Sequence, residues 1–211
     1  MIFAGIDLSI NSSALCIETK SEYIFHFTKL DGYKYKKGVI QNFEILENCG
    51  INYIFIENYC KDNKLLLYEE IVDKILSILL KYENIIVGIE NISYSIVGNK
   101  VFELSNLNFL LQYKLYKSSL EYFLFPPLTI KRTSFFSEGK IFRRNDIRKE
   151  SIIKNFLEYI DTDEKLKNSN ICNCIYDLNI KSKPVDDIVD GFWTLLTLKK
   201  HYKDGRETKQ S

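Results

Sequence analysis

The chain has 211 residues, of which 45% are hydrophobic and 27% charged, so we expect one globular domain spanning residues 1–211. Lys and Arg (29) nearly cancel Asp and Glu (28), so net charge alone predicts no nucleic-acid partner, and a basic surface must come from local clustering. No apolar segment reaches the roughly 18 residues of a membrane span. The apolar opening run lacks the basic lead of a signal peptide, and five cysteines without zinc-site spacing favour reduced thiols and a cytoplasmic location.

The first predicted strand, residues 1–8, is apolar until it reaches Asp7. Burying an unpaired carboxylate costs several kcal/mol, so a metal ion, a hydrogen-bond donor or solvent must compensate Asp7. Small polar residues at 9–13 predict a turn into a second strand at 14–17. Asp7 therefore lies at the mouth of a hairpin, and an aspartate that merely caps this turn is the alternative interpretation.

The remaining elements alternate in character along the chain. A third strand is expected at 23–27, and residues 29–63 are interpreted as an insertion in which 40–46 suggest a short helix and 53–56 a strand. Beyond it, apolar periodicity predicts helices at 65–82, 101–118, 145–159 and 185–202, strands at 84–89 and 122–125, and a flexible tail at 203–211. This order is that of an α/β, ribonuclease H-like fold, a mixed five-stranded sheet flanked by helices.

Acidic residues stand at three separate places where a strand ends or a helix begins. Asp7 and Glu90 each terminate an apolar strand, and the last helix opens with Asp186, Asp187 and Asp190. Asp186, Asp187 and Asp190 fall on one edge of that helix at ~100° per residue. Stabilisation of helix-start acids by the macrodipole would explain one or two of them, but it does not explain Asp7 or Glu90.

One other acid resembles Glu90 in its local sequence. Glu57 follows Ile56 in IFIENY much as Glu90 follows Ile89 in VGIENISY. We favour Glu90, because a helix, a basic segment and the aspartate helix follow it in the expected order.

Converging carboxylates repel one another and need cations to neutralise them. Hard oxygen ligands of this kind select Mg²⁺ or Mn²⁺. A pair of such ions about 3.5–4 Å apart can activate water and stabilise a departing oxygen. The carboxylates therefore predict phosphodiester hydrolysis with two metal ions per active site and no covalent enzyme intermediate.

Basic residues gather between the second acid and the aspartate helix. Residues 129–154 carry eight Lys or Arg against three Asp or Glu, a local excess of +5 that suits a phosphate backbone. A solvated helix face would equally explain Arg148, Lys149 and Lys154. We predict DNA contacts for four of the five basic residues outside that face and for one aromatic residue after Glu90 that could stack on a base: Lys131, Lys140, Arg143, Arg144 and Tyr94. A partly buried loop tyrosine is the alternative interpretation for Tyr94.

In four stretches taken in order the sequence resembles the RuvC-type Holliday-junction resolvases, especially their phage and virus branch. The stretches are GIDLSINSSAL, IENISYSIVGNKVFELSNLNFLLQYKLY, FPPLTIKRTSFFSEGKIFRRNDI and VDDIVDGFWTLLTL. They cover roughly half of the chain. The resemblance implies a homodimeric, Mg²⁺-dependent crossover junction endodeoxyribonuclease that resolves branched DNA by paired nicks.

The resemblance also implies roles for individual residues. The four metal-binding and catalytic carboxylates would be Asp7, Glu90, Asp187 and Asp190, the last two matching the family's D-x-x-D pattern. Lys131 matches the family's lysine after the fifth strand, Arg144 falls at a lysine near a helix start, and Tyr94 falls near an aromatic residue at the junction centre. The sequence departs from the family's usual residues at Leu8, Asn91, Phe142 and Arg143. These differences bear on junction specificity more than on the chemistry.

Other functions remain compatible with parts of the pattern. A ribonuclease H acting on RNA/DNA hybrids would use the same metal chemistry, and a non-catalytic branched-DNA-binding relative would tolerate loss of an acid, although all four are present. Sugar-kinase and actin-like ATPases share the GIDxS opening. They need two such domains and glycine-rich adenosine loops, for which 211 residues with nine glycines leave no room.

Overall fold

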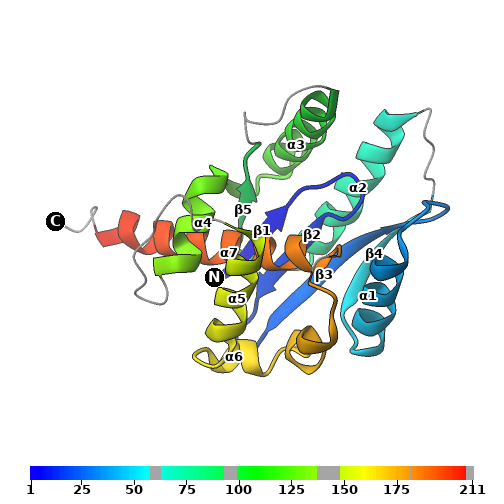
Figure 1. The fold of residues 1–211 in the computed structure, drawn as a ribbon. Coiled ribbons are helices and arrows are strands. Elements are labelled where there is room, and N and C mark those ends of the chain that lie inside the picture. Colours follow the sequence, from blue (N-terminus) through cyan, green and yellow to red (C-terminus); the bar gives the residue numbers. More distant parts are fainter. Residues whose placement is uncertain (58–62, 93–98, 137–147, 181, 208–211) are drawn as a thin grey trace.

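A computed structural model describes residues 1–57, 63–92, 99–136, 148–180 and 182–207. These residues form a central β-sheet covered by helices on both faces (Figure 1). The sheet has six strands in the order β4-β3-β2-β1-β5-β6. The strands are β1 (Ile2–Asp7), β2 (Ala14–Glu18), β3 (Tyr23–Leu30), β4 (Asn52–Ile56), β5 (Ile85–Glu90) and β6 (Glu121–Phe125).

Strand directions divide the sheet into two parts. β1, β2 and β3 form an antiparallel meander, whereas β5 runs parallel to β1 and β6 parallel to β5. The predicted mixed, ribonuclease H-like sheet is therefore confirmed, with one strand more than expected. The additional strand is β4, which pairs parallel with β3 at the edge of the sheet. Ile54 and Ile56 of β4 are buried, whereas Tyr53 and Phe55 on its other face are exposed, as suits a strand at the edge of the sheet.

The helices form a layer on each face of the sheet. One face packs on α2 (Lys64–Leu79) and α3 (Asn99–Lys117), and the other on the remaining long helices. The helices of the second face are α1 (Lys37–Asn48), α4 (Pro127–Phe136), α5 (Lys149–Ile160) and α7 (Val185–Glu207). The side chains of the strands other than β4 alternate between two apolar clusters, as the two-residue period of a strand requires, while β4 contributes Ile54 and Ile56 to one of them.

Two regions differ from the sequence prediction. No helix was predicted just after β6, but Pro127 there is the first residue of α4, a position that suits its fixed φ. The stretch between α5 and α7, for which no element was predicted, contains α6 (Glu164–Lys167) and the 3₁₀ turns η2 (Asn170–Asn173) and η3 (Ile175–Asp177). Both regions are short, so neither has a long apolar period that would reveal a helix.

The ends of the predicted segments also shift. Residues 29–63, interpreted as an insertion, supply α1 and β4, which belong to the helix layer and to the sheet. Residues 203–207, expected to be a flexible tail, continue α7, while residues 208–211 lie outside the described part of the chain.

Two predictions from composition can be compared with the described residues. Cys16, Cys49, Cys172 and Cys174 form no disulfide. Among the residues that the structure describes, no helix combines the length and apolar character that crossing a membrane requires.

Candidate functional site

The ends of β1 and β5 place Asp7 and Glu90 side by side. The parallel register pairs Gly5 with Gly88 and Ile6 with Ile89. Asp7 and Glu90 are therefore the next residues on two adjacent strands. Ile6 and Ile89 belong to the apolar cluster against α2 and α3. Because successive side chains point to opposite faces, Asp7 and Glu90 point to the α7 face.

Close packing of α7 on β1 brings Asp190 to the same place. A Cβ on Gly5 would lie 2.2 Å from the carbonyl oxygen of Gly191 and 2.3 Å from the amide nitrogen of Leu195, so only a glycine allows this approach. A Cβ on Gly88 would lie 3.3 Å from the carbonyl oxygen of Thr194. The two glycines that precede the acids by two residues therefore let the helix lie against the sheet where it carries Asp190.

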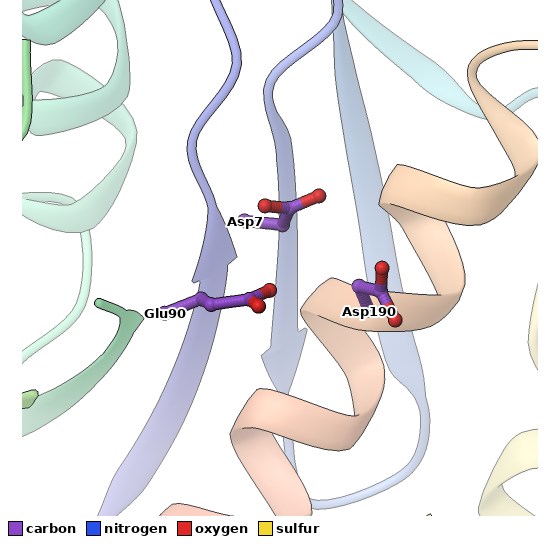
Figure 2. Close-up of side chains that lie close together, drawn as sticks. All are labelled: Asp7, Glu90 and Asp190. Carbon is purple, nitrogen blue, oxygen red and sulfur yellow. The ribbon is translucent and has the colours of Figure 1, made fainter. Parts of the chain in front are cut away.

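Asp7, Glu90 and Asp190 converge on one point (Figure 2). Each offers a carboxylate oxygen, and these oxygens all lie within 4.8 Å of one another. Burial raises the pKa of Asp7 well above its usual range, and the nearby charges of Glu90, Asp187 and Asp190 raise it further. Burial likewise raises the pKa of Glu90 to about 7 and that of Asp190 to about 8. Three carboxylates this close together can all be ionised only when a cation lies beside them.

Asp187 lies next to this cluster but is engaged elsewhere. Its side chain is 2% exposed, its Oδ2 accepts a hydrogen bond of 2.6 Å from Ser12 Oγ, and its Oδ1 forms an ion pair with Lys183. Burial raises the pKa of Asp187, although Lys183 and Ser12 oppose this. The structure therefore brings together three of the four predicted carboxylates, and holds the fourth through Ser12 and Lys183.

The neighbouring Asp186 faces two lysines. Its Oδ2 lies 3.2 Å from Lys183 Nζ and also pairs with Lys149. Burial would raise the pKa of Asp186, but the two ammonium groups outweigh burial and lower it. Asp186 is thus a charged partner for lysines and is not one of the three clustered acids.

Lys131 lies beside the same acids. It stands in α4 and lines a cleft of about 200 Å³ together with Asp7 and Glu90. Its charge opposes the rise in the pKa of Glu90. A cation beside clustered carboxylates can bind a phosphate that approaches them. Leu8, Ile92, Leu104 and Pro127 add an apolar wall to the cleft.

The structure does not describe the other predicted DNA contacts, and it places the Glu57 alternative away from the cluster. Tyr94, Lys140, Arg143 and Arg144 lie outside the described residues. Glu57 follows the edge strand β4, three strands away from β1, and its carboxylate lies 3.6 Å from Lys74 Nζ. Glu57 does not join the cluster that Glu90 joins.

Sequence reasoning missed several residues that shape this site. Ser12 lies 175 residues from Asp187, and nothing local connects them. Lys183 stands four residues before Asp187 at the start of a helix, a spacing that often forms an ion pair and could have identified it. The recurrence of glycine two residues before each strand-end acid was a second available signal.

The fold and this site can be compared with known proteins. No known family model matches the sequence, and no curated protein matches it. Solved structures do match. RuvC from Thermus thermophilus in complex with a Holliday junction substrate has 10% identity and a TM-score of 0.53, covering 97% of both chains. Another structure of Thermus thermophilus RuvC has 13% identity and a TM-score of 0.50, covering 95% of this chain and 96% of that one.

A third structure comes from a eukaryote. The yeast mitochondrial Holliday junction resolvase Ydc2 has 16% identity and a TM-score of 0.51, covering 98% of this chain and 83% of its own. The chain therefore has the ribonuclease H-like fold of RuvC-like resolvases over nearly its whole length.

Proposed function

We propose that this protein is a metal-dependent, structure-selective DNA endonuclease that resolves four-way junctions and other branched DNA by phosphodiester hydrolysis. The observation that carries the proposal is the convergence of Asp7, Glu90 and Asp190 beside Lys131. The likeness to RuvC bound to a junction substrate adds support, because that fold presents a junction-binding surface in another protein. Branched DNA is accordingly the proposed substrate.

The donor set fits a hard divalent cation. Three carboxylates within 4.8 Å of one another supply the oxygen ligands that Mg²⁺ and Mn²⁺ prefer. Their pKa values are raised first by burial and then by neighbouring negative charge, which such an ion would neutralise. Asp7, Glu90 and Asp190 would hold the ion, with Asp187 as a fourth ligand for a second one. Ions of this kind supply an activated water and stabilise the leaving oxygen during phosphodiester hydrolysis.

The residues around the acids have complementary tasks. Lys131 would bind the phosphate next to the scissile bond, since a point charge at the cleft mouth needs no base contact. The apolar wall of Leu8, Leu104 and Pro127 would accommodate the sugar or base beside that phosphate. Lys140, Arg143, Arg144 and Tyr94 remain proposed DNA contacts on sequence grounds.

Paired nicks require two active sites, and we propose that a homodimer provides them. Along the outer side of α3 four aromatic side chains lie within ~60° of arc at 100° per residue. They are Phe102 (72% exposed), Phe109 (70%), Tyr113 (50%) and Tyr116 (72%). Contiguous exposed apolar side chains commonly mark a protein interface, and α3 offers this face while burying Leu107, Leu111 and Leu115.

The proposed setting rests on sequence alone. Reduced cysteines favour a cytoplasmic location, and the stretches that resemble resolvases favour the phage and virus branch.

Cleavage of matched substrates tests the function directly. Four-way junction, flap, RNA/DNA hybrid and linear duplex of the same sequence should be presented with Mg²⁺, with EDTA as the blank. We expect cleavage of the branched substrates only. Asp7→Asn should lower the cleavage rate by about a hundredfold or more, the scale of losing an essential charged group, yet still bind junction in a gel-shift assay.

Three other results would contradict the proposal. Preferential cleavage of the hybrid would indicate a ribonuclease H. Binding without cleavage by the wild-type protein would indicate a non-catalytic relative. Undiminished cleavage by Asp7→Asn would remove Asp7 from the catalytic centre.

A further inference from the structure

Among the described residues, Asp187 is the only one of the four proposed ligands whose two carboxylate oxygens each have a hydrogen-bond donor or an ammonium group as partner. Ser12 donates to Oδ2 and the Lys183 ammonium pairs with Oδ1. A divalent ion bound at Oδ1 would lie next to this ammonium, and the two positive charges would repel each other. The ammonium therefore already supplies, at Asp187, the positive charge that an ion would bring.

Lys183 is held in this place by α1, a helix outside the site. The side chain of Asn42 is fully buried, and its Nδ2 donates to the backbone oxygens of Asn179, Ser182 and Lys183 at 3.0, 3.0 and 3.2 Å. Asn42 Oδ1 in turn accepts from the Asn179 amide at 2.8 Å. Such a fully used amide fixes the backbone from which the Lys183 side chain reaches the acids.

A second acid can receive the ammonium if it leaves Asp187. Asp186 Oδ2 lies 3.2 Å from Lys183 Nζ, and the lysine side chain is 40% exposed. Movement from one carboxylate to its neighbour would leave the ammonium paired and close to water, so displacement does not strand a buried charge. Lys149 also pairs with Asp186 but makes no contact with Asp187 that the structure records.

We propose that Lys183 competes with the second divalent ion for Asp187 and so makes ion binding sequential. The first ion binds to Asp7, Glu90 and Asp190 without disturbing Lys183. The second binds weakly, because it must displace the ammonium from Asp187 onto Asp186. Lys183 is thus a positioning residue that keeps the site from filling both ion positions until substrate phosphate adds negative charge. This inference rests on the proposed metal-binding function and adds a control on the number of ions that the site holds.

Counting bound Mn²⁺ tests the competition without any cleavage assay. The full-length chain is titrated with MnCl₂, and free Mn²⁺ is read from its electron paramagnetic resonance signal. We expect one tight and one much weaker ion in the wild-type protein. In Lys183→Met the weaker dissociation constant should fall by about tenfold or more, because a like charge within hydrogen-bond reach of the ligand is removed.

Three further variants show whether the effect belongs to Lys183 and Asp187. Lys183→Arg keeps the charge and should bind the second ion as weakly as wild type does. Lys149→Met removes the other lysine that pairs with Asp186, whose charge also acts on Glu90, and should strengthen the second ion much less than Lys183→Met does. In an Asp187→Asn background, Lys183→Met should no longer strengthen the second ion. Far-UV circular dichroism of each variant verifies that it is folded.

The outcomes separate this inference from the proposed function. If no protein in the series binds Mn²⁺, the metal-dependent function itself fails. Suppose that wild type and Lys183→Met bind the first ion with the same dissociation constant and that the variant binds the second ion no more tightly. The competition is then wrong, and the nuclease proposal stands. Two equally tight ions in wild type, or loss of the first ion in Lys183→Met, also overturn the competition.

Discussion

Asp7, Glu90 and Asp190 place three mutually repelling carboxylates in a partly buried site. Burial and this repulsion raise their pKa values, to about 7 for Glu90 and about 8 for Asp190. The unfolded chain releases these protons near pH 4, while the folded protein retains them up to those values. The metal-free protein therefore loses stability as the pH rises from about 4 to 8, because the folded state binds more protons over that range.

Asp190→Asn should remove part of this pH dependence. At pH 8 without divalent ions we expect the variant to be more stable than wild type by about 2 kcal/mol, less than an isolated shift implies because the acids share protons. At pH 4, close to the pKa of the carboxyl in the unfolded chain, the two should differ least. Thermal unfolding in EDTA at both pH values measures this.

Added Mg²⁺ supplies the complementary result. It should stabilise wild type at pH 8 more than it stabilises Asp190→Asn, because the variant lacks a ligand. Glu57→Gln is the matched control, an exposed acid at the end of another strand. If Asp190→Asn kept the pH profile and the Mg²⁺ response of wild type, Asp190 would not interact electrostatically with Asp7 and Glu90.

Helix α7 and strand β1 set the positions of the acids through their close contact. The backbone of α7 lies so near to Gly5 that any Cβ there would overlap the backbone of Gly191 and Leu195. Two backbone segments cannot yield as a flexible side chain does, so an added methyl group must push the helix away from the sheet. Asp190 is carried by that helix and would move with it.

Gly5→Ala should therefore damage both stability and ion binding. We expect a loss of about 1–3 kcal/mol in the free energy of unfolding, the usual scale of overpacking, with weaker Mn²⁺ binding to the folded variant. Urea denaturation and Mn²⁺ titration measure the two effects. Gly205→Ala lies near the end of the same helix with no atom within 4 Å of its new Cβ and should lose neither. Equal stability and equal ion affinity for Gly5→Ala would refute the packing argument.

The same contacts explain how much the sequence could predict. Asp7 and Glu90 were identifiable because a carboxylate at the end of an apolar strand is unusual, and parallel strands bring such ends together. Asp190 was identifiable because it falls with Asp186 and Asp187 on one edge of the last helix. The role of Gly5 depends on the distance to a helix nearly two hundred residues away. The partners of Asp187 depend on the loop before α7, which Asn42 of α1 fixes, so local patterns could not reveal that this acid is already paired.

At the scale of elements, the prediction failed where the sequence carries little local signal. A strand was expected at 53–56 and β4 confirms it, but its pairing with β3 at the edge of the sheet depends on contacts that a local pattern does not show. No helix was predicted where α4 lies, because it begins at Pro127 just after β6, and proline also ends strands. Its buried Ile130 and Phe135 are too few to show a helical period in the sequence. The central strands and α2, which are apolar over whole periods, were predicted nearly at their observed limits.

For the whole molecule, the exposed aromatic side of α3 predicts self-association. Phe109→Asp places a charge in the middle of this face and should convert a dimer into a monomer in sedimentation velocity without lowering the melting temperature. Tyr176→Asp alters an aromatic side chain of similar exposure (67%) on η3 and should leave the dimer intact. A wild-type protein that sediments as a monomer both alone and with junction DNA would contradict a dimer through α3.

The central claim is that acids distant in sequence meet to hold divalent ions, and anomalous diffraction from Mn²⁺-soaked crystals tests it most directly. We predict a manganese peak within coordination distance of Asp7, Glu90 and Asp190 in wild type, and no peak there in Asp7→Asn crystals soaked identically. A wild-type map without a peak at these three carboxylates, at Mn²⁺ concentrations that saturate binding in solution, would contradict the account.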